Sequence, residues 1–371
     1  TVMYASYLST GTVDSGSGVT LFDGANVYAY GAIGITGKGI PAGISSSYGT
    51  NFGINIWSTT TTIRSYNSSV SLTGYANGRL TYSNFSANTP SAGVLVYSDH
   101  NIIRGRTDVN ITGINLSGIG VWLAAYASGS NGVVADGGNI TIKGINNYSG
   151  WFAVYMRQSL TATLGDITIS GAGIHGIALD SADSSVTAAG NINMIGYAST
   201  GHGIWLNSGV TDSLRSTGGS IVLSAYTSAT STSNYGFYLG SSTTIRASQN
   251  ITFQGSTLLA AATGSGIIIN AATAATPVFA TANAGSALVG PGTTTSIYAD
   301  GAITATSGYV QFAGNTSVAG LVTAGGGVAL SGNATYSLTN TSNNIASLAA
   351  SVGSGRSEER RVGKECLRLC R

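Results

Sequence analysis

Two aspartates in one loop, Asp180 and Asp183, form the carboxylate pair of this chain that best suits acid–base chemistry. A glycosidase needs two carboxyl groups about 5–10 Å apart, one of them with a raised pKa. The sequence Leu-Asp-Ser-Ala-Asp equally suits a turn, because Asp and Ser side chains cap local backbone amides. We favour the turn, and outside the last sixteen residues the chain has no glutamate that could serve as a further partner.

Two histidines, His175 and His202, could bind a transition metal. They are 27 residues apart and each precedes a glycine that opens a repeated strand, so we expect their rings to stack one coil apart, about 5 Å from each other. A metal site would need a third or fourth ligand. The equivalent positions of other repeats are mostly apolar or aromatic: Phe52, Ala92, Ile119, Phe152, Tyr235 and Ser265. We therefore favour ring stacking at a corner of the coil, and predict no metal, cofactor or catalytic residue.

Four arginines directly follow an apolar residue that marks another repeated strand: Arg64, Arg104, Arg215 and Arg246. We expect them to form one solvent-facing row, which could bind sulfated or carboxylated glycans through bidentate contacts. Exposed arginines on a strand also suppress association with other chains. We favour this second interpretation, because Ala135 and Thr187 interrupt the row.

The four tryptophans, Trp57, Trp122, Trp151 and Trp205, lie in or beside a single strand of the repeat. Trp122 and Trp205 alternate with residues predicted to face inward, so we expect their rings to be exposed. Exposed aromatic rings are typical of surfaces that stack on sugars or contact a partner.

A repeat of 25–39 residues positions all these side chains. Its first strand reads apolar–x–apolar–x–Gly, with alanine replacing the glycine once, at 33–37, 70–74, 109–113, 140–144, 167–171, 192–196, 221–225 and 251–255. A period of this size, with alternating apolar residues inside it, predicts a solenoid of stacked β-coils.

Two further strands complete each predicted coil. The second strand lies at 53–56, 93–96, 120–123, 153–156, 176–179, 203–206, 236–239 and 266–269. The third is marked by one apolar residue in each coil: Val27, Ile63, Ile103, Val134, Val186, Leu214 and Ile245. Three short strands separated by Gly, Ser, Asn and Asp turns predict an all-β parallel β-helix of about ten coils.

The turn before the first strand carries a short polar side chain in each coil: Ser69, Asp108, Asn139, Asp166, Asn191, Ser220 and Asn250. Such side chains bond nearby backbone groups and tolerate tight turns. We expect a polar ladder along this corner, which gives Asp108 and Asp166 a structural role.

The composition fits a globular β-protein, with 54 Gly, 4 Pro, 8% charged and 43% hydrophobic residues. No apolar run approaches the ~18 residues of a membrane span. The chain opens at Thr1 without a basic and apolar leader pattern, and the repeat is established by Val27, so we expect an internal fragment. We predict the β-helix at 1–310 and a less regular continuation of the repeat at 311–355.

The segment 356–371 differs from the rest in composition. It holds both cysteines, all three glutamates and six of the fifteen Lys and Arg residues. Its sequence resembles the translation of a sequencing adapter, and we predict a non-native tail. Without it the net charge is near zero, which gives no reason to expect a nucleic-acid partner, and no cysteine remains for a disulfide or a thiolate metal site.

Three segments carry a resemblance to a family: Gly-Asn-Ile-Thr-Ile at 138–142, Gly-Ala-Ile-Thr-Ala-Thr-Ser-Gly at 301–308, and Leu-Thr-Asn-Thr-Ser-Asn-Asn-Ile-Ala-Ser-Leu-Ala at 338–349. Their style resembles filamentous-haemagglutinin-like exoproteins of two-partner secretion and, more loosely, autotransporter passengers. The resemblance implies a right-handed β-helical shaft, export through an outer-membrane transporter, and adhesion, aggregation or biofilm formation at the bacterial surface. The chain departs from some such adhesins in having no Arg-Gly-Asp triplet.

Two functional classes therefore stay open, with a third set aside. The leading hypothesis is a non-enzymatic shaft segment of a secreted bacterial adhesin, whose partners are surface glycans or proteins. The alternative is a polysaccharide lyase or glycoside hydrolase, which would require charged side chains from adjacent coils to converge in a groove. A phage tail-spike would need trimerisation determinants that the sequence does not show.

Overall fold

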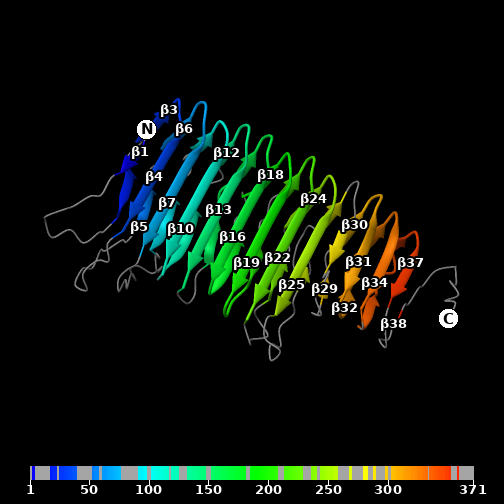
Figure 1. Ribbon diagram of the computed structural model, residues 1–371. Coiled ribbons are helices and arrows are strands. Elements are labelled where there is room, and N and C mark those ends of the chain that lie inside the picture. The colour runs from blue at the N-terminus through cyan, green and yellow to red at the C-terminus, as the bar shows by residue number, and fades with distance from the viewer. Residues whose placement is uncertain are drawn as a thin grey trace.

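The computed structural model describes residues 2–4, 17–22, 25–39, 52–57, 61–76, 91–97, 102–116, 118–124, 132–147, 152–180, 184–207, 213–228, 235–239, 243–257, 267–269, 279–282, 287–289, 297–299, 302–332, 334–351 and 357–358. These residues form strands and turns, and within them there is no helix long and apolar enough to cross a membrane. The strands are parallel and build three long sheets, so the predicted parallel β-helix is confirmed (Figure 1).

Sheet A contains the predicted first strand of each coil. Its thirteen strands, in spatial order, are β1 (Val2–Tyr4), β4 (Ile33–Lys38), β7 (Val70–Ala76), β10 (Val109–Asn115), β13 (Ile140–Asn146), β16 (Ile167–Gly173), β19 (Ile192–Ala198), β22 (Ile221–Thr227), β25 (Ile251–Thr257), β28 (Ala287–Val289), β31 (Tyr309–Ala313), β34 (Gly327–Ser331) and β37 (Leu348–Ser351).

Sheet B contains the predicted second strand. Its thirteen strands are β2 (Val19–Phe22), β5 (Phe52–Trp57), β8 (Ala92–Tyr97), β11 (Ile119–Ala124), β14 (Phe152–Met156), β17 (His175–Leu179), β20 (Ile204–Leu206), β23 (Phe237–Leu239), β26 (Ile267–Ile269), β29 (Ile297–Ala299), β32 (Thr316–Val318), β35 (Tyr336–Leu338) and β38 (Ser357–Glu358).

Sheet C contains the predicted third strand. Its twelve strands are β3 (Asn26–Ala29), β6 (Thr62–Ser65), β9 (Ile102–Gly105), β12 (Val133–Ala135), β15 (Leu160–Ala162), β18 (Val186–Ala188), β21 (Leu214–Ser216), β24 (Thr244–Ala247), β27 (Phe279–Ala282), β30 (Ala302–Ala305), β33 (Val322–Ala324) and β36 (Asn344–Ile345).

The repeat keeps its register from coil to coil. In sheet A, Ile140 pairs with Ile167, and Ile167 pairs with Ile192. The stack is an elongated rod with β1 at one end and β37 at the other (Figure 1). Each coil therefore contacts mainly its two neighbours, which is the defining property of a solenoid.

The glycine that closes the first-strand motif is required by the corner between sheets A and B. A Cβ atom on Gly144 would lie 2.0 Å from the backbone oxygen of Ala153, and one on Gly113 would lie 2.0 Å from that of Gly120. In these coils only glycine lets the two backbones approach this closely, whereas β22 has Ala225 at the same position.

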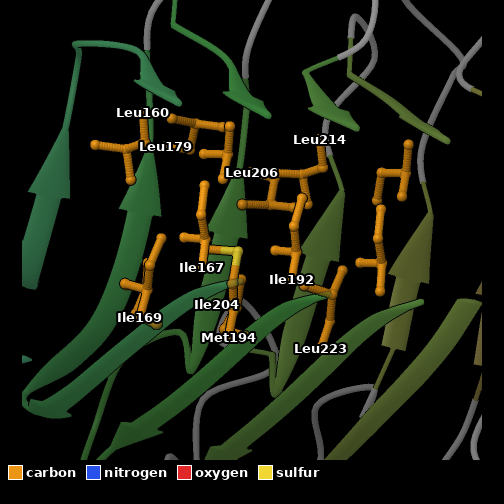
Figure 2. Close-up of a cluster of buried hydrophobic side chains, with 14 of the residues drawn as sticks. Leu160, Ile167, Ile169, Leu179, Ile192, Met194, Ile204, Leu206, Leu214 and Leu223 are labelled. Carbon is orange, nitrogen blue, oxygen red and sulfur yellow. The ribbon is translucent and has the colours of Figure 1, made fainter. Parts of the chain in front are cut away.

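The core is the inside of the coil, where alternate residues of all three sheets meet. Leu160, Ile167, Ile192 and Ile204, from β15, β16, β19 and β20, lie together there and are fully buried (Figure 2). Full burial of such a side chain stabilises the fold by about 1.5–3 kcal/mol. Because equivalent side chains stack on each other, the core continues along the rod.

Two details of the predicted repeat were wrong. The count of about ten coils was too low, because the coils at the carboxyl end shorten: the aligned residues Ala287, Val310, Val328 and Leu348 are 23, 18 and 20 residues apart. The inward residue of β12 is Val133, and Val134 faces outward, since Val133 pairs with Ile103. Two adjacent valines left the phase of the alternation undecided in the sequence, and the pairing with β9 decides it.

The strands continue in the same three sheets on both sides of residue 310. Of the predicted tail, Ser357–Glu358 forms β38, which pairs with β35. Its other residues lie outside the described part of the chain.

Candidate functional site

The outer side of sheet B carries a group of rings that we call the aromatic face. It consists of Tyr97, Trp122, Phe152, Tyr155, His175, His202, Trp205, Tyr235 and Tyr238. These rings point outward because their neighbours along each strand, such as Val121 and Leu123, face the core. The register then lines them up, with Trp122 opposite Tyr155 and Trp205 opposite Tyr238.

The rings contact each other across successive coils. Phe152 and His175 have ring centroids 4.8 Å apart, His175 and His202 5.8 Å, and His202 and Tyr235 5.5 Å. The two histidine rings therefore meet one coil apart, as predicted, although their planes are tilted by 42° and are not stacked in parallel.

A small residue allows one contact to skip a coil. Phe152 on β14 lies 5.6 Å from Trp205, which is on β20, although β17 lies between these strands. The residue of β17 that pairs with Trp205 is Ala178, whose side chain is too small to separate the two rings.

One ring nitrogen of each histidine, Nδ1, accepts a hydrogen bond from a backbone N–H group. The backbone N–H of His202 donates to Nδ1 of His175 at 3.1 Å, and that of Tyr235 donates to Nδ1 of His202 at 3.2 Å. Burial lowers the pKa of His175, and burial together with the neighbouring His175 lowers that of His202 from 6.5 to about 4. Both imidazoles are therefore neutral near pH 7, with Nδ1 as the acceptor.

Within the described residues, no three His, Cys, Asp or Glu side chains come together as a metal site.

Asp180 lies at the edge of the aromatic face and is held by two neighbours. The Tyr155 hydroxyl donates to its Oδ2 at 2.7 Å, and Nε of Arg157 donates to its backbone oxygen at 3.0 Å. Burial and the Asp180 carboxylate raise the pKa of Tyr155 well above its usual 10. Asp183 lies outside the described residues, so the structure does not test whether Asp180 and Asp183 form a carboxylate pair.

The predicted exposure of Trp122 and Trp205 was wrong. Both side chains are half-buried, and the indole N–H of each is buried and has no hydrogen-bond partner among the described residues. Trp151 and the side chain of Trp57 lie outside the described residues. Next to the aromatic face on sheet B, the outward residues Phe52, Ala92, Leu95 and Ile119 form a fully buried cluster, and Tyr97, Trp122 and Tyr155 of the aromatic face pack against it. The sequence feature that could have indicated this buried outer side of sheet B is the unbroken apolar run at 94–96, which is typical of a strand buried on both sides.

The arginines on the outside of sheet C form two pairs and not one row. Arg64 aligns with Arg104, and Arg215 aligns with Arg246. Val134, Thr161 and Thr187 separate the pairs; Ala135, which we predicted as an interruption, is buried inside. Arg104 makes a forked ion pair with Asp136, with Nε and Nη2 2.7–3.1 Å from the carboxylate, and this bond raises the pKa of Arg104.

The polar ladder before sheet A is present. The backbone N–H of Asn139 donates to Oδ1 of Asp108, that of Asp166 to Oδ1 of Asn139, and that of Asn191 to Oδ1 of Asp166, at 2.5–2.8 Å. The same contact continues to Ser220 and Asn250. Asp108 and Asp166 therefore have the structural role that the turn pattern predicted.

Sequence reasoning did not single out Tyr28, Tyr30 and Tyr66, which are exposed and in mutual contact near the amino-terminal end. Their spacing in the sequence does not indicate that they meet. Only the register of sheet C shows that they lie together.

In comparisons with protein-family models, curated proteins and solved structures, none matches this chain.

Proposed function

We propose that this chain is a stiff shaft segment of a secreted bacterial surface adhesin and is not an enzyme. The observation that supports it is the continuous stack of in-register coils, which makes a rod that runs from β1 to β37 (Figure 1). Such a rod holds a binding surface away from the cell, and weak contacts repeated along it add through avidity. A coil that needs only its neighbour can also form progressively as the chain emerges from an outer-membrane transporter.

The resemblance to filamentous-haemagglutinin-like exoproteins supports the same proposal. On this proposal the protein lies on the outer surface of a bacterium and contacts host or bacterial glycans or proteins. Adhesion and biofilm formation are the roles that follow.

The alternative, a lyase or glycosidase acting on polysaccharides, has one observation in its favour. Asp180 lies beside Tyr155, Arg157 and the rings of the aromatic face, which together could hold a sugar chain. Against it, the described carboxylates of Asp108, Asp136, Asp166 and Asp180 each accept a structural hydrogen bond.

One experiment separates the two functions. The 371-residue chain is coupled to beads, and bead attachment to bacterial and epithelial surfaces is counted while a panel of polysaccharides is assayed for cleavage. We expect attachment without cleavage, unchanged in Asp180→Asn. Cleavage that disappears in Asp180→Asn would establish the enzyme, and beads that neither attach nor cleave would contradict both functions.

A further inference from the structure

An exposed cluster at the corner between sheets C and A combines aromatic rings with positive charge. We call it the tyrosine–arginine patch. Tyr28, Tyr30, Arg64 and Tyr66 contact one another in it, and Arg106 belongs to it by register, since it lies two residues after Arg104, the residue aligned with Arg64. The tyrosine side chains are 54%, 78% and 39% exposed for Tyr28, Tyr30 and Tyr66. Such exposed rings on an otherwise polar surface mark an interaction site.

The first two coils hold the rings close together. The ring centroids of Tyr30 and Tyr66 are 5.5 Å apart, and those of Tyr28 and Tyr66 are 6.2 Å apart. Tyr28 aligns with Arg64 across β3 and β6, and the backbone N–H of Tyr66 donates to Ala29. The patch is therefore fixed by the sheet and its turns.

Among the described residues, no carboxylate pairs with the arginines of the patch. The Arg64 guanidinium lies over the Tyr66 ring, with Cζ 4.7 Å from its centroid. Arg106 is exposed, and neither arginine forms an ion pair with a described residue. The nearest acid in sequence, Asp108, already accepts the backbone N–H of Asn139.

The next coil shows what these arginines could hold. Arg104 forms a bidentate ion pair with the carboxylate of Asp136, the first residue after β12. Arg64 aligns with Arg104, but the first residue after β9 is Arg106, so a second cation takes the position of the acid. Two arginines on adjacent coils that form no ion pair with a described residue favour a carboxylate supplied by a ligand.

We infer that the tyrosine–arginine patch binds a carboxylated saccharide, with the acid group at Arg64 and Arg106 and a sugar ring on Tyr30. The flat, exposed tyrosine rings suit the C–H faces of a pyranose, whereas a simple acidic side chain would leave them uncovered. This inference rests on the proposed function, since it gives the shaft its own glycan-binding surface.

Calorimetry with a galacturonic acid tetramer tests the inference on the full chain. We expect binding that Arg64→Gln or Arg106→Gln weakens about tenfold, as for a lost charged hydrogen bond. Tyr30→Ala should weaken it about fivefold, as for a lost ring contact. The matched controls are Arg246→Gln in the second arginine pair and Tyr197→Ala, another exposed tyrosine, and both should bind like the unchanged protein.

Three comparison ligands complete the experiment: a neutral galactose tetramer, a sulfated oligosaccharide and a glutamate tetrapeptide. The inference requires the uronate to bind most tightly. Equal binding of the neutral sugar, tighter binding of the sulfated sugar or the peptide, or no uronate binding would each overturn it. So would binding that survives Arg64→Gln and Arg106→Gln, which would indicate the basic segment 356–371. Rod length in electron micrographs tests the shaft separately, because it does not depend on these substitutions.

Discussion

Sheets A and B have the same strand number and stacking but differ in what lies on their outer sides. Strand β10 of sheet A alternates strictly between buried residues and half-buried ones. Strand β8 of sheet B is buried at five of its six residues. Sheet A therefore has one face that solvent reaches, whereas this part of sheet B is buried on both faces. The outer side of sheet B accordingly carries aromatic rings and apolar side chains.

The largest effect on stability is expected from truncating one side chain on each of the two outer faces and comparing the results. Leu95→Ala, on sheet B, removes a fully buried side chain, and we expect it to lower the free energy of unfolding by about 2–4 kcal/mol. Thr141→Ala, on the exposed outer face of sheet A, should change it by less than about 0.5 kcal/mol.

Urea denaturation followed by circular dichroism measures both truncations. Equal effects of the two substitutions would show that the two outer faces are equivalent in solution, and would remove the distinction drawn above.

The same difference explains how far the sequence predicts the structure. The inner face repeats at every coil, so the period, the three strands, the turn ladder and the closing glycines such as Gly144 could all be read from residue spacing. The outer faces follow no such rule, because alternation says which residues point outward and not what covers them. Trp122, Trp205 and Leu95 were misjudged or missed for this reason.

The sequence also did not predict which outward side chains of neighbouring coils align with each other. The arginines split into two pairs, and Tyr30 meets Tyr66, only once the coils are aligned residue by residue. Variation in loop length hides this alignment from a one-dimensional pattern.

The pH dependence of stability tests the comparison through the half-buried histidines of the aromatic face, His175 and His202. The unfolded chain binds a proton on His202 near pH 6.5, but the folded chain does so only near pH 4. The unfolded state thus holds more protons on this residue in this window, so the contribution of His202 to the free energy of unfolding falls as the pH drops from 6.5 to 4. A shift of this size corresponds to a loss of about 3 kcal/mol.

His202→Phe provides the control, because phenylalanine occupies the equivalent position in β5 and β14. It should flatten most of the pH dependence between 4 and 6.5, leaving the smaller contribution of His175. Unfolding curves at stepped pH values would detect this, and an unchanged slope in the variant would assign the dependence to other groups.

The smallest effect is expected at the polar ladder beside sheet A, where solvent reaches the side chains. Oδ1 of Asp108 accepts the backbone N–H of Asn139, and in the next coil an asparagine, Asn139, accepts that of Asp166 in the same way. The ladder thus needs an oxygen acceptor and not a charge, so Asp108→Asn should leave stability nearly unchanged, whereas Asp108→Ala should cost about 1 kcal/mol. Thermal unfolding of the two variants side by side measures the difference. A larger loss in Asp108→Asn than in Asp108→Ala would mean that the negative charge, and not the acceptor, is what this corner of the coil requires.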